Sequence, residues 1–329
     1  MTSLELERRP SRSPYNERMC GNLTRNRASL LLEVARMYWD EGLGQTEIAR
    51  RTGYSRPTIS RMLAEARRVG VVTVTVAHPI ERLMALEKRL VDAFGLKTAR
   101  VSEATPGNGS DVARTAADLL LESCGPHSVI AVSNGRAVAA VVHHTPERSW
   151  PSSTAVAMLG SVGESFNTED GPDVCRNLSL RLGGRFRSLT VFDSLALVRA
   201  VREEDQVATT LELAARSDIA LTGVGTVGTS VSPLLRRWMT PEVVRECRKR
   251  NVVAHVCGHH LDASGRHVHT ALCDRTLCLD PERLREIPLV VGVAAGPDKI
   301  VAIRAALRGG YLSALVTDEA TARAVLKDA

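Results

Sequence analysis

Apolar residues in the first quarter of the chain recur every three or four positions, the spacing of one face of an amphipathic helix. Residues 23–41 predict a first helix, and residues 46–51 predict a short second helix with Ile48 and Ala49 turned inward. The inward-facing positions expected on the first helix are Leu30, Leu31, Val34, Ala35 and Tyr38. We expect this face to pack beneath the helices that follow.

Residues 53–68 predict a tight turn followed by a third helix. Gly53 permits a sharp bend, Ser55 stands at the expected N-cap, and Pro57 falls in the first turn, where a missing N–H costs nothing. Helical spacing then places Ile59, Leu63 and Ala66 toward the core. The range 71–76 alternates like a strand and would form a wing beside the helices.

Basic side chains gather on the outward face of the third helix. Residues 50–68 hold six arginines and one acid, Glu65, and residues 1–78 hold 13 basic and 8 acidic side chains, a net +5 of the chain's +6. Such a pattern favours a helix-turn-helix that binds double-stranded operator DNA, and the alternative is a solvated basic helix in an ordinary helical domain. The candidate DNA-binding residues are Thr46, Ser55, Arg56, Thr58, Ser60, Arg61, Arg67 and Arg68. Because one helix reads only a few base pairs, specificity requires a homo-oligomer, a dimer or a tetramer.

Length and composition indicate a globular chain of about two domains. Its 329 residues are 44% hydrophobic, 24% charged and only 3% aromatic. We expect a disordered basic arm over 1–21, a helix-turn-helix domain over 22–78, a linker helix over 79–96 and a large second domain over 97–329. No segment approaches the roughly 20 apolar residues of a membrane helix. The first residues lack the apolar core of a signal peptide, and the seven cysteines are an odd number suited to free thiols, so we expect a cytoplasmic protein.

The linker helix carries a narrow apolar stripe. Leu83, Leu86, Leu90 and Phe94 lie on one side of the helix predicted from residue 80 onward. This stripe either packs on its own chain or forms a short dimer seam, since it is too short for a self-sufficient coiled coil.

From Lys97 onward, short apolar runs alternate with helical segments. Strands are predicted at 98–101, 128–132, 155–159, 219–222 and 289–293, and helices at 112–124 and 136–143. This alternation predicts an α/β domain, with an open, largely parallel, Rossmann-like sheet and helices on both faces.

Glycine-containing loops follow four of these strands, at 132–136, 159–163, 223–225 and 294–299. Ligands of open α/β sheets bind beyond the carboxyl ends of the strands, and two of these loops also open helices whose N–H groups can hold an anion. The candidate ligand-binding residues are Ser133, Asn134, Gly135, Arg136, Gly160, Ser161, Gly223, Gly225, His255 and Lys299. Any single glycine loop can instead be a tight turn required by the fold alone.

The chain resembles the SorC family of bacterial sugar-responsive transcription regulators. The resemblance covers about residues 24–329 and is carried by the helix-turn-helix, the loop Ser133–Arg136, the segment 254–258, the segment 299–310 and the ending 315–322. It implies an effector domain with the fold of sugar-phosphate isomerases and deaminases, a tetramer, and a carbohydrate effector such as a phosphorylated sugar or polyol from a catabolic operon.

Several positions depart from the family pattern. The usual Ser-Trp-Gly-Arg-Thr reads Ser-Asn-Gly-Arg-Ala over 133–137, and Ser161 and Ala295 replace glycines. His255 stands where the family has an aspartate, and a neutral imidazole accepts one hydrogen bond and donates one, whereas a carboxylate only accepts. The pocket position therefore carries over, but the identity of the sugar does not.

Seven histidines and cysteines lie within residues 255–273. If residues 255–259 form one strand, 255, 257 and 259 share a face, with 267 and 269 on a partner strand after a turn at 261–266. Such residues can bind zinc and would then make a metal-responsive regulator, but their spacing matches no closed zinc pattern. We therefore prefer surface histidines with no metal and no cofactor, and His255 touching the effector. An isomerase-like or deaminase-like enzyme is the other alternative, but it requires an acid/base pair that these loops do not supply.

Overall fold

The computed structural model describes residues 24–73, 79–103, 109–160, 169–189, 195–227 and 239–328. Its contacts divide the chain into two compact units, 1–78 and 79–329. The predicted arm at 1–21 lies outside the described residues. None of the described helices combines the length and apolar character that crossing a bilayer requires.

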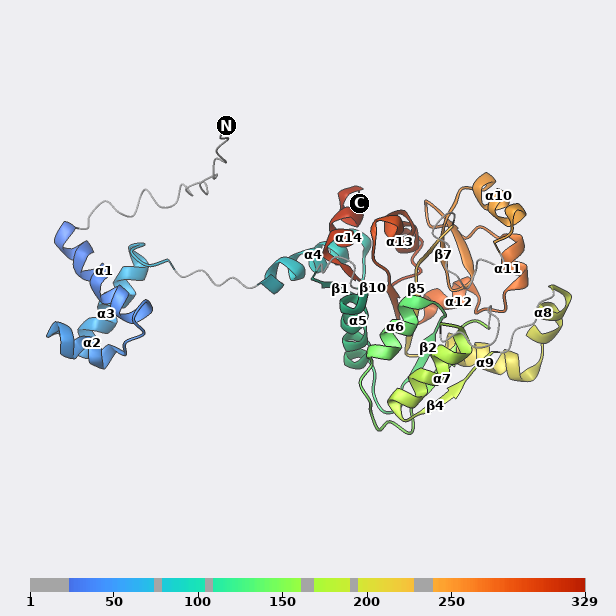
Figure 1. Ribbon diagram of the computed structural model, residues 1–329, viewed down its shortest axis with the longest axis horizontal. Coiled ribbons are helices and arrows are strands. Elements are labelled where there is room, and N and C mark those ends of the chain that lie inside the picture. The colour runs from blue at the N-terminus through green and yellow to red at the C-terminus, as the bar shows by residue number, and fades with distance from the viewer. Residues whose placement is uncertain are drawn as a thin grey trace, which may run out of the picture. The chain divides into compact units, whose positions relative to one another are not determined.

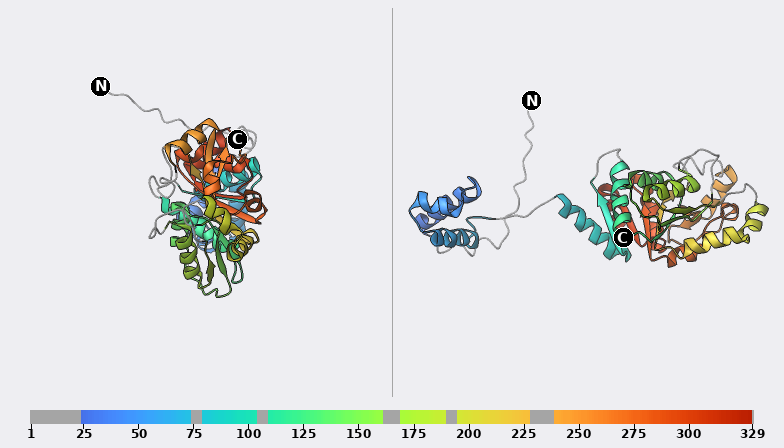
Figure 2. Two further views of the ribbon diagram at one scale, coloured as in Figure 1. Left: turned by 90° about the vertical axis from the view of Figure 1, so that its right-hand side faces the viewer. Right: turned by 90° about the horizontal axis from the view of Figure 1, so that it is seen from below.

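The N-terminal unit is a bundle of three helices packed against one another (Figure 2). They are α1 (Arg25–Trp39), α2 (Gln45–Thr52) and α3 (Arg56–Arg68). Its core contains the predicted Leu31, Val34, Ile48, Ile59 and Leu63, together with the unpredicted Met62. Residues 71–73 are not in a strand, and 74–76 lie outside the described residues, so the wing stays a prediction.

The larger unit is built on a seven-stranded, all-parallel sheet with helices on either side (Figure 1). The strand order is β1-β10-β9-β5-β2-β3-β4. The strands are β1 (Thr98–Ser102), β2 (Val129–Val132), β3 (Thr154–Ala157), β4 (Arg185–Arg187), β5 (Ile219–Gly223), β9 (Leu289–Val293) and β10 (Ala314–Asp318). Helices of this unit are α4 (Pro79–Phe94), α5 (Gly109–Ser123), α6 (Arg136–His144), α7 (Gly171–Leu182), α8 (Leu195–Arg202), α9 (Asp205–Ala215), α10 (Pro241–Lys249), α11 (Ala271–Arg275), α12 (Pro281–Glu286), α13 (Ile300–Arg308) and α14 (Glu319–Val325). The α/β architecture predicted from the alternating pattern is confirmed.

Alternate strand residues enter two separate hydrophobic clusters, one on each face of the sheet. Ile130 and Val132 of β2 join the cluster that contains α5, α6 and α7. Ala131, between them, joins the cluster that contains α4, α9, α13 and α14. Strands buried on both faces read as continuous apolar runs, which is why five of them were visible in the sequence.

The helix α4 packs on its own chain. Leu83, Leu86 and Leu90 are buried in the core of the larger unit, and Arg82 reaches Glu319 of α14 at 2.9 Å. Of the two alternatives for the apolar stripe, the intramolecular one is therefore correct, and the stripe is not available as a dimer seam.

A second, three-stranded antiparallel sheet has the order β6-β7-β8, made of β6 (Gly225–Thr226), β7 (Val252–Val256) and β8 (His259–Asp262). The predicted turn at 261–266 is confirmed: residues 263–264 form a turn, the N–H of Asp262 donates to the carbonyl of Arg266 at 3.0 Å, and His267 pairs antiparallel with Leu261. A further hairpin turn, which the sequence analysis does not predict, joins β7 to β8 at Cys257 and Gly258. Both have positive φ, 45° and 86°, as a two-residue type I′ turn requires. His255 and His259 are therefore on different strands, and His267 makes only an isolated bridge to Leu261.

Two glycines bring the loop after β8 against the end of α13. A Cβ added at Gly265 would lie 2.2 Å from the backbone nitrogen of Gly309, and one added at Gly309 would lie 2.3 Å from the carbonyl oxygen of Gly265. Only residues without a side chain permit this backbone-to-backbone contact, which joins two parts of the larger unit.

Candidate nucleic-acid interface and ligand pocket

The turn between α2 and α3 has the predicted capping. Gly53 ends α2 with φ +75°, and its N–H donates to the carbonyl of Ala49 at 3.0 Å. The Oγ of Ser55 accepts the N–H of Thr58 at 3.4 Å and lies 2.8 Å from the Thr58 hydroxyl. Ser55 thus supplies one of the acceptors that the first turn of α3 needs.

The exposed face of α3 is basic along its whole length. Its exposed polar side chains are Arg56, Ser60, Arg61, Arg67 and Arg68. Thr58 is half-buried, while Thr46 is exposed on α2. The one acid of α3, Glu65, is half-buried and paired with Arg27 of α1. An exposed helix face with four arginines and no acid suits a phosphate backbone.

Three further arginines of the unit, Arg67 of α3 among them, already have partners. Glu47 accepts hydrogen bonds from Arg50 at 2.6 and 2.9 Å and from Arg51 at 3.1 Å. The Arg50 and Arg51 guanidinium groups together lower the pKa of Glu47 to about 2. The guanidinium of Arg67 lies over the ring of Trp39, 5.2 Å from its centroid. The sequence count of arginines therefore overstates the positive charge that is free for DNA.

Tyr54 is a position in this unit that the sequence analysis missed. Its side chain is 40% exposed in the turn directly before α3. An exposed aromatic residue in a helix-turn-helix turn can pack against a sugar-phosphate strand, and its place next to Ser55 was the available signal.

In the larger unit, a pocket of about 470 Å³ opens at the carboxyl ends of β2, β5 and β9. Eight of the ten predicted ligand residues line it: Ser133, Asn134, Gly135, Arg136, Gly223, Gly225, His255 and Lys299. Gly160 does not line it and instead donates its N–H to the carbonyl of Leu277 at 2.8 Å. Ser161 lies outside the described residues.

Further lining residues escaped the sequence analysis. Val112 and Ala113 of α5 and Val293 of β9 form an apolar wall, and Thr226 and Cys257 come from the three-stranded sheet. Burial raises the pKa of the Cys257 thiol well above its usual value, so this side chain acts as a small apolar group. A strand pattern alone does not reveal which helix covers the mouth of a pocket.

Two cations face this pocket without a carboxylate among the described lining residues. Burial and the nearby Arg136 lower the pKa of Lys299, while Asp298 opposes them. Neither Arg136 nor Lys299 forms a salt bridge with another described residue. Their arrangement favours an anionic ligand, because the approach of two positive charges is unfavourable until an anion lies between them.

Neutral polar groups complete the lining. Burial, aided by His260, His259 and Lys299, lowers the pKa of His255 to about 3, so its imidazole is neutral at physiological pH. The Nδ2 of Asn134 is buried and has no hydrogen-bond partner among the described residues. Both side chains can therefore bind hydroxyl groups of a ligand.

A histidine and cysteine cluster lies beyond the hairpin, close to the pocket. The rings of His255 and His260 are 5.6 Å apart, and the Nδ1 of His260 lies 2.7 Å from the hydroxyl of Thr270. Burial disfavours the charged forms of both Cys273 and His260. The contacts between neighbouring thiols and imidazoles favour the charged forms and have the larger combined effect on the two pKa values. The imidazoles of His260 and His267 lower the pKa of Cys273 to about 4, and the thiols of Cys247 and Cys273 raise the pKa of His260 to about 9.

Comparison with known protein families matches both units. Residues 78–327 match the family described as "Putative sugar-binding domain", and residues 40–74 match the "IclR helix-turn-helix domain". The first match contains the whole ligand pocket, and the second contains α2, the turn and α3.

Individual relatives align along most of the chain. The deoxyribonucleoside regulator of Bacillus subtilis is 29% identical over 313 residues, covering 93% of this chain and 100% of the relative. The transcriptional regulator LsrR of Klebsiella pneumoniae is 31% identical over 307 residues, covering 90% and 92%. Among solved structures, the full-length sorbitol operon regulator SorC of Klebsiella pneumoniae is similar with a TM-score of 0.72 and 26% identity, covering 92% of this chain and 100% of that one. These relatives are regulators of transcription, not enzymes.

Proposed function

This chain belongs to the SorC family of sugar-binding transcriptional regulators, and we propose that its effector is a phosphorylated sugar or polyol bound in the pocket of the larger unit. The chain is a DNA-binding regulator whose DNA affinity responds to a carbohydrate. The enzyme alternative is excluded by its relatives.

The observation that carries the proposal is the pair of cations, Arg136 and Lys299, in a pocket whose described lining contains no aspartate or glutamate. A phosphate placed between them also meets the first N–H groups of α6, which begins at Arg136 with no side-chain cap. The hydroxyls of the carbohydrate then face Asn134 and His255. An uncharged sugar would place no anion between the exposed Arg136 and the half-buried Lys299.

On the DNA side, we propose that α3 enters the major groove of an operator. Arg56, Thr58, Ser60 and Arg61 lie at or near its N-terminal end, which recognition helices direct toward bases. Arg68 and the exposed Thr46 of α2 are our candidates for phosphate contacts. Ser55 acts through the cap. Since the partner is genomic DNA, we infer action in the cytoplasm, as a homo-oligomer on a catabolic operon.

Effector control requires two arrangements of the protein with different ligand affinity. A ligand with equal affinity for both shifts nothing, and typical couplings are about 1–3 kcal/mol. We propose that closure of the Ser133–Arg136 loop and the Lys299 region around the phosphate distinguishes the two.

The effector is tested by thermal-shift screening of sugar and polyol phosphates, each paired with its unphosphorylated form. We expect at least one phosphate to raise the Tm of the wild type, its unphosphorylated partner to act more weakly, and Lys299→Ala to lose the response. Lys249→Ala, an exposed lysine on α10, is the matched control and should respond as the wild type does. An identical response of Lys299→Ala, or no stabilisation by any phosphate, would contradict the proposed site.

A further inference from the structure

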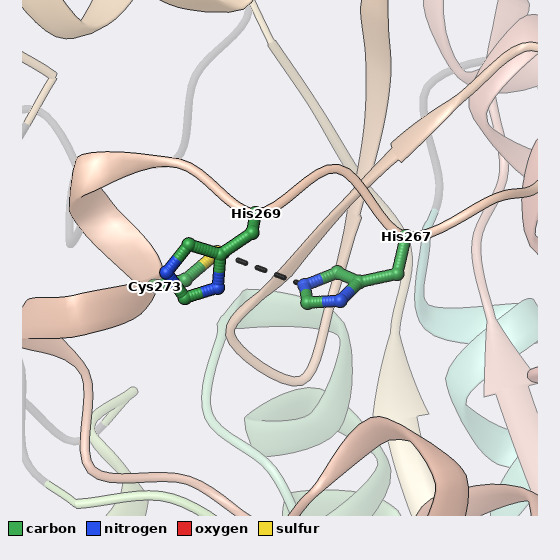
Figure 3. A group of neighbouring side chains, drawn as sticks. All are labelled: His267, His269 and Cys273. Carbon is green, nitrogen blue, oxygen red and sulfur yellow. Dashed lines mark hydrogen bonds between the residues drawn. The ribbon is translucent and has the colours of Figure 1, made fainter.

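Three side chains after β8 bring nitrogen and sulfur ligand atoms together outside the effector pocket. One such atom from each of His267, His269 and Cys273 lies within 4.8 Å of the other two. Figure 3 shows the side chains converging, with a ring nitrogen of His267 directed at the sulfur of Cys273. The distance from His267 Nε2 to Cys273 Sγ is 3.8 Å. A tetrahedral zinc ion with ordinary bond lengths would hold a nitrogen and a sulfur about 3.6 Å apart.

Hydrogen bonds that do not involve the three ligand side chains hold the neighbouring backbone in place. Asp262 Oδ1 accepts the N–H groups of Ser264 and Arg266, at 2.9 and 3.0 Å, which fixes the loop before His267. The N–H of Val268 then donates to the carbonyl of His260 at 2.8 Å. The segment 267–273 is therefore arranged by the fold, as a ligand site requires.

Neighbouring polar groups can orient the ligand atoms. Asp274 Oδ1 lies 3.1 Å from Nε2 of His269, which leaves Nδ1 of that ring for an ion, in the carboxylate–histidine–metal arrangement. The hydroxyl of Thr270 lies 3.6 Å from the sulfur of Cys273.

A fourth candidate metal ligand, His259, lies beside His267, His269 and Cys273. The ring of His259 is 5.1 Å from the ring of His267, and its Nε2 lies 2.7 Å from the carbonyl of Leu279, to which it can only donate. The lone pair is therefore on Nδ1, which is buried and has no partner among the described residues. A buried acceptor without a partner carries a free-energy cost that a bound ion or its water would remove.

We propose that His267, His269 and Cys273 bind a borderline-soft divalent transition-metal ion, and that this ion is Zn²⁺. Imidazole and thiolate together exclude the hard cations Mg²⁺ and Ca²⁺, which take oxygen ligands. His269 is 63% exposed, so the site is open on one side and keeps a position for water or for His259. An ordinary thiol–imidazole contact between His267 and Cys273 does not involve His269, whose ring is oriented by Asp274 toward the same place.

The test uses the untagged full-length protein, reduced and stripped with a chelator, and titrated with CoCl₂. We expect one Co²⁺ per chain, with a near-ultraviolet thiolate-to-cobalt absorption band and the intense visible bands of a four-coordinate ion. Added ZnCl₂ should abolish both. Cys273→Ser should lose the ultraviolet band, whereas Cys124→Ser, a half-buried thiol outside the cluster, should keep it.

His269→Asn separates ligand loss from misfolding, because this side chain is too exposed to disturb the core. It should weaken Co²⁺ binding by about tenfold or more while its circular dichroism stays that of the wild type. The proposal is overturned if, at micromolar concentration, the wild type binds less than one equivalent of Co²⁺ and also less than one equivalent of Zn²⁺. It is equally overturned if Cys273→Ser or His269→Asn binds Co²⁺ with wild-type affinity and spectrum.

Discussion

At the scale of single residues, His255 links burial to pH dependence. Its pKa is about 3 in the folded chain and about 6.5 when unfolded. Above pH 6.5 the imidazole is neutral in both states. As the pH falls from 6.5 toward 3, only the unfolded state binds the proton, so stability is lost over that window.

The prediction is a comparison of variants in chemical denaturation at pH 7 and pH 5. The wild type should lose about 2 kcal/mol more over this interval than His255→Asn. His259, His260 and Lys299 are present in both proteins, and the variant removes only the imidazole of His255. His127→Asn, an exposed histidine, should behave as the wild type. Equal losses in the wild type and His255→Asn would show that the imidazole is solvated.

Residue positions were predictable where a loop follows a strand, and unpredictable where side chains meet across elements. Ser133–Arg136 and Lys299 each follow a buried strand, so their place in the pocket could be inferred. The spacing of His267, His269 and Cys273 matches no closed zinc site, so the sequence alone does not predict a metal site there. The three side chains meet where a loop joins α11, and the hydrophobic pattern of a sequence does not predict the geometry of such a junction.

At the scale of elements, α3 presents one face to the core and the other to solvent. Arg61→Ala should weaken operator binding by about 1–3 kcal/mol if the side chain reaches a base. Arg245→Ala on the exposed surface of α10 is the control and should change nothing. Fluorescence anisotropy with operator and random duplexes at physiological salt measures both. Equal affinity of the wild type for the two duplexes would contradict sequence-specific recognition.

The element boundaries show which signals a sequence carries. Helices with an amphipathic stripe were placed within a few residues, as with α4 and α6. All three residues of the strand β4 are exposed, and the strand β6 is only two residues long. Neither strand therefore produces a hydrophobic run in the sequence. The turn at Asp262–Gly265 has a typical turn sequence and is predictable, whereas the turn at Cys257 and Gly258 lacks the Asn-Gly signature of a type I′ hairpin and is not.

At the scale of the whole molecule, the apolar stripe of α4 is already buried, so we predict that the proposed assembly uses other surfaces. Exposed apolar side chains of the larger unit include Ile80 at 52%, Met84 at 57%, Leu180, Phe186 and Val301. We expect both the full chain and the fragment of residues 79–329 to sediment as a dimer or tetramer at micromolar concentration. A monomeric fragment beside an oligomeric full chain would assign assembly to the DNA-binding unit.

The overall topology was only partly accessible from the sequence. The alternation of strands and helices predicts a parallel sheet, but not that β10 lies between β1 and β9. That order depends on long-range pairing, in which the last strand returns to meet the first.

The contact between Gly265 and Gly309 connects the effector pocket, through α13, to the proposed metal site. The helix α13 begins next to Lys299 in the pocket and ends at Gly309, which touches the loop two residues before His267. If movement of this helix accompanies occupancy of either place, the two occupants are linked, and each changes the other's dissociation constant by one common factor. Starvation for the ion would then alter the carbohydrate threshold of the operon, and abundance of the carbohydrate would alter how tightly the ion is retained.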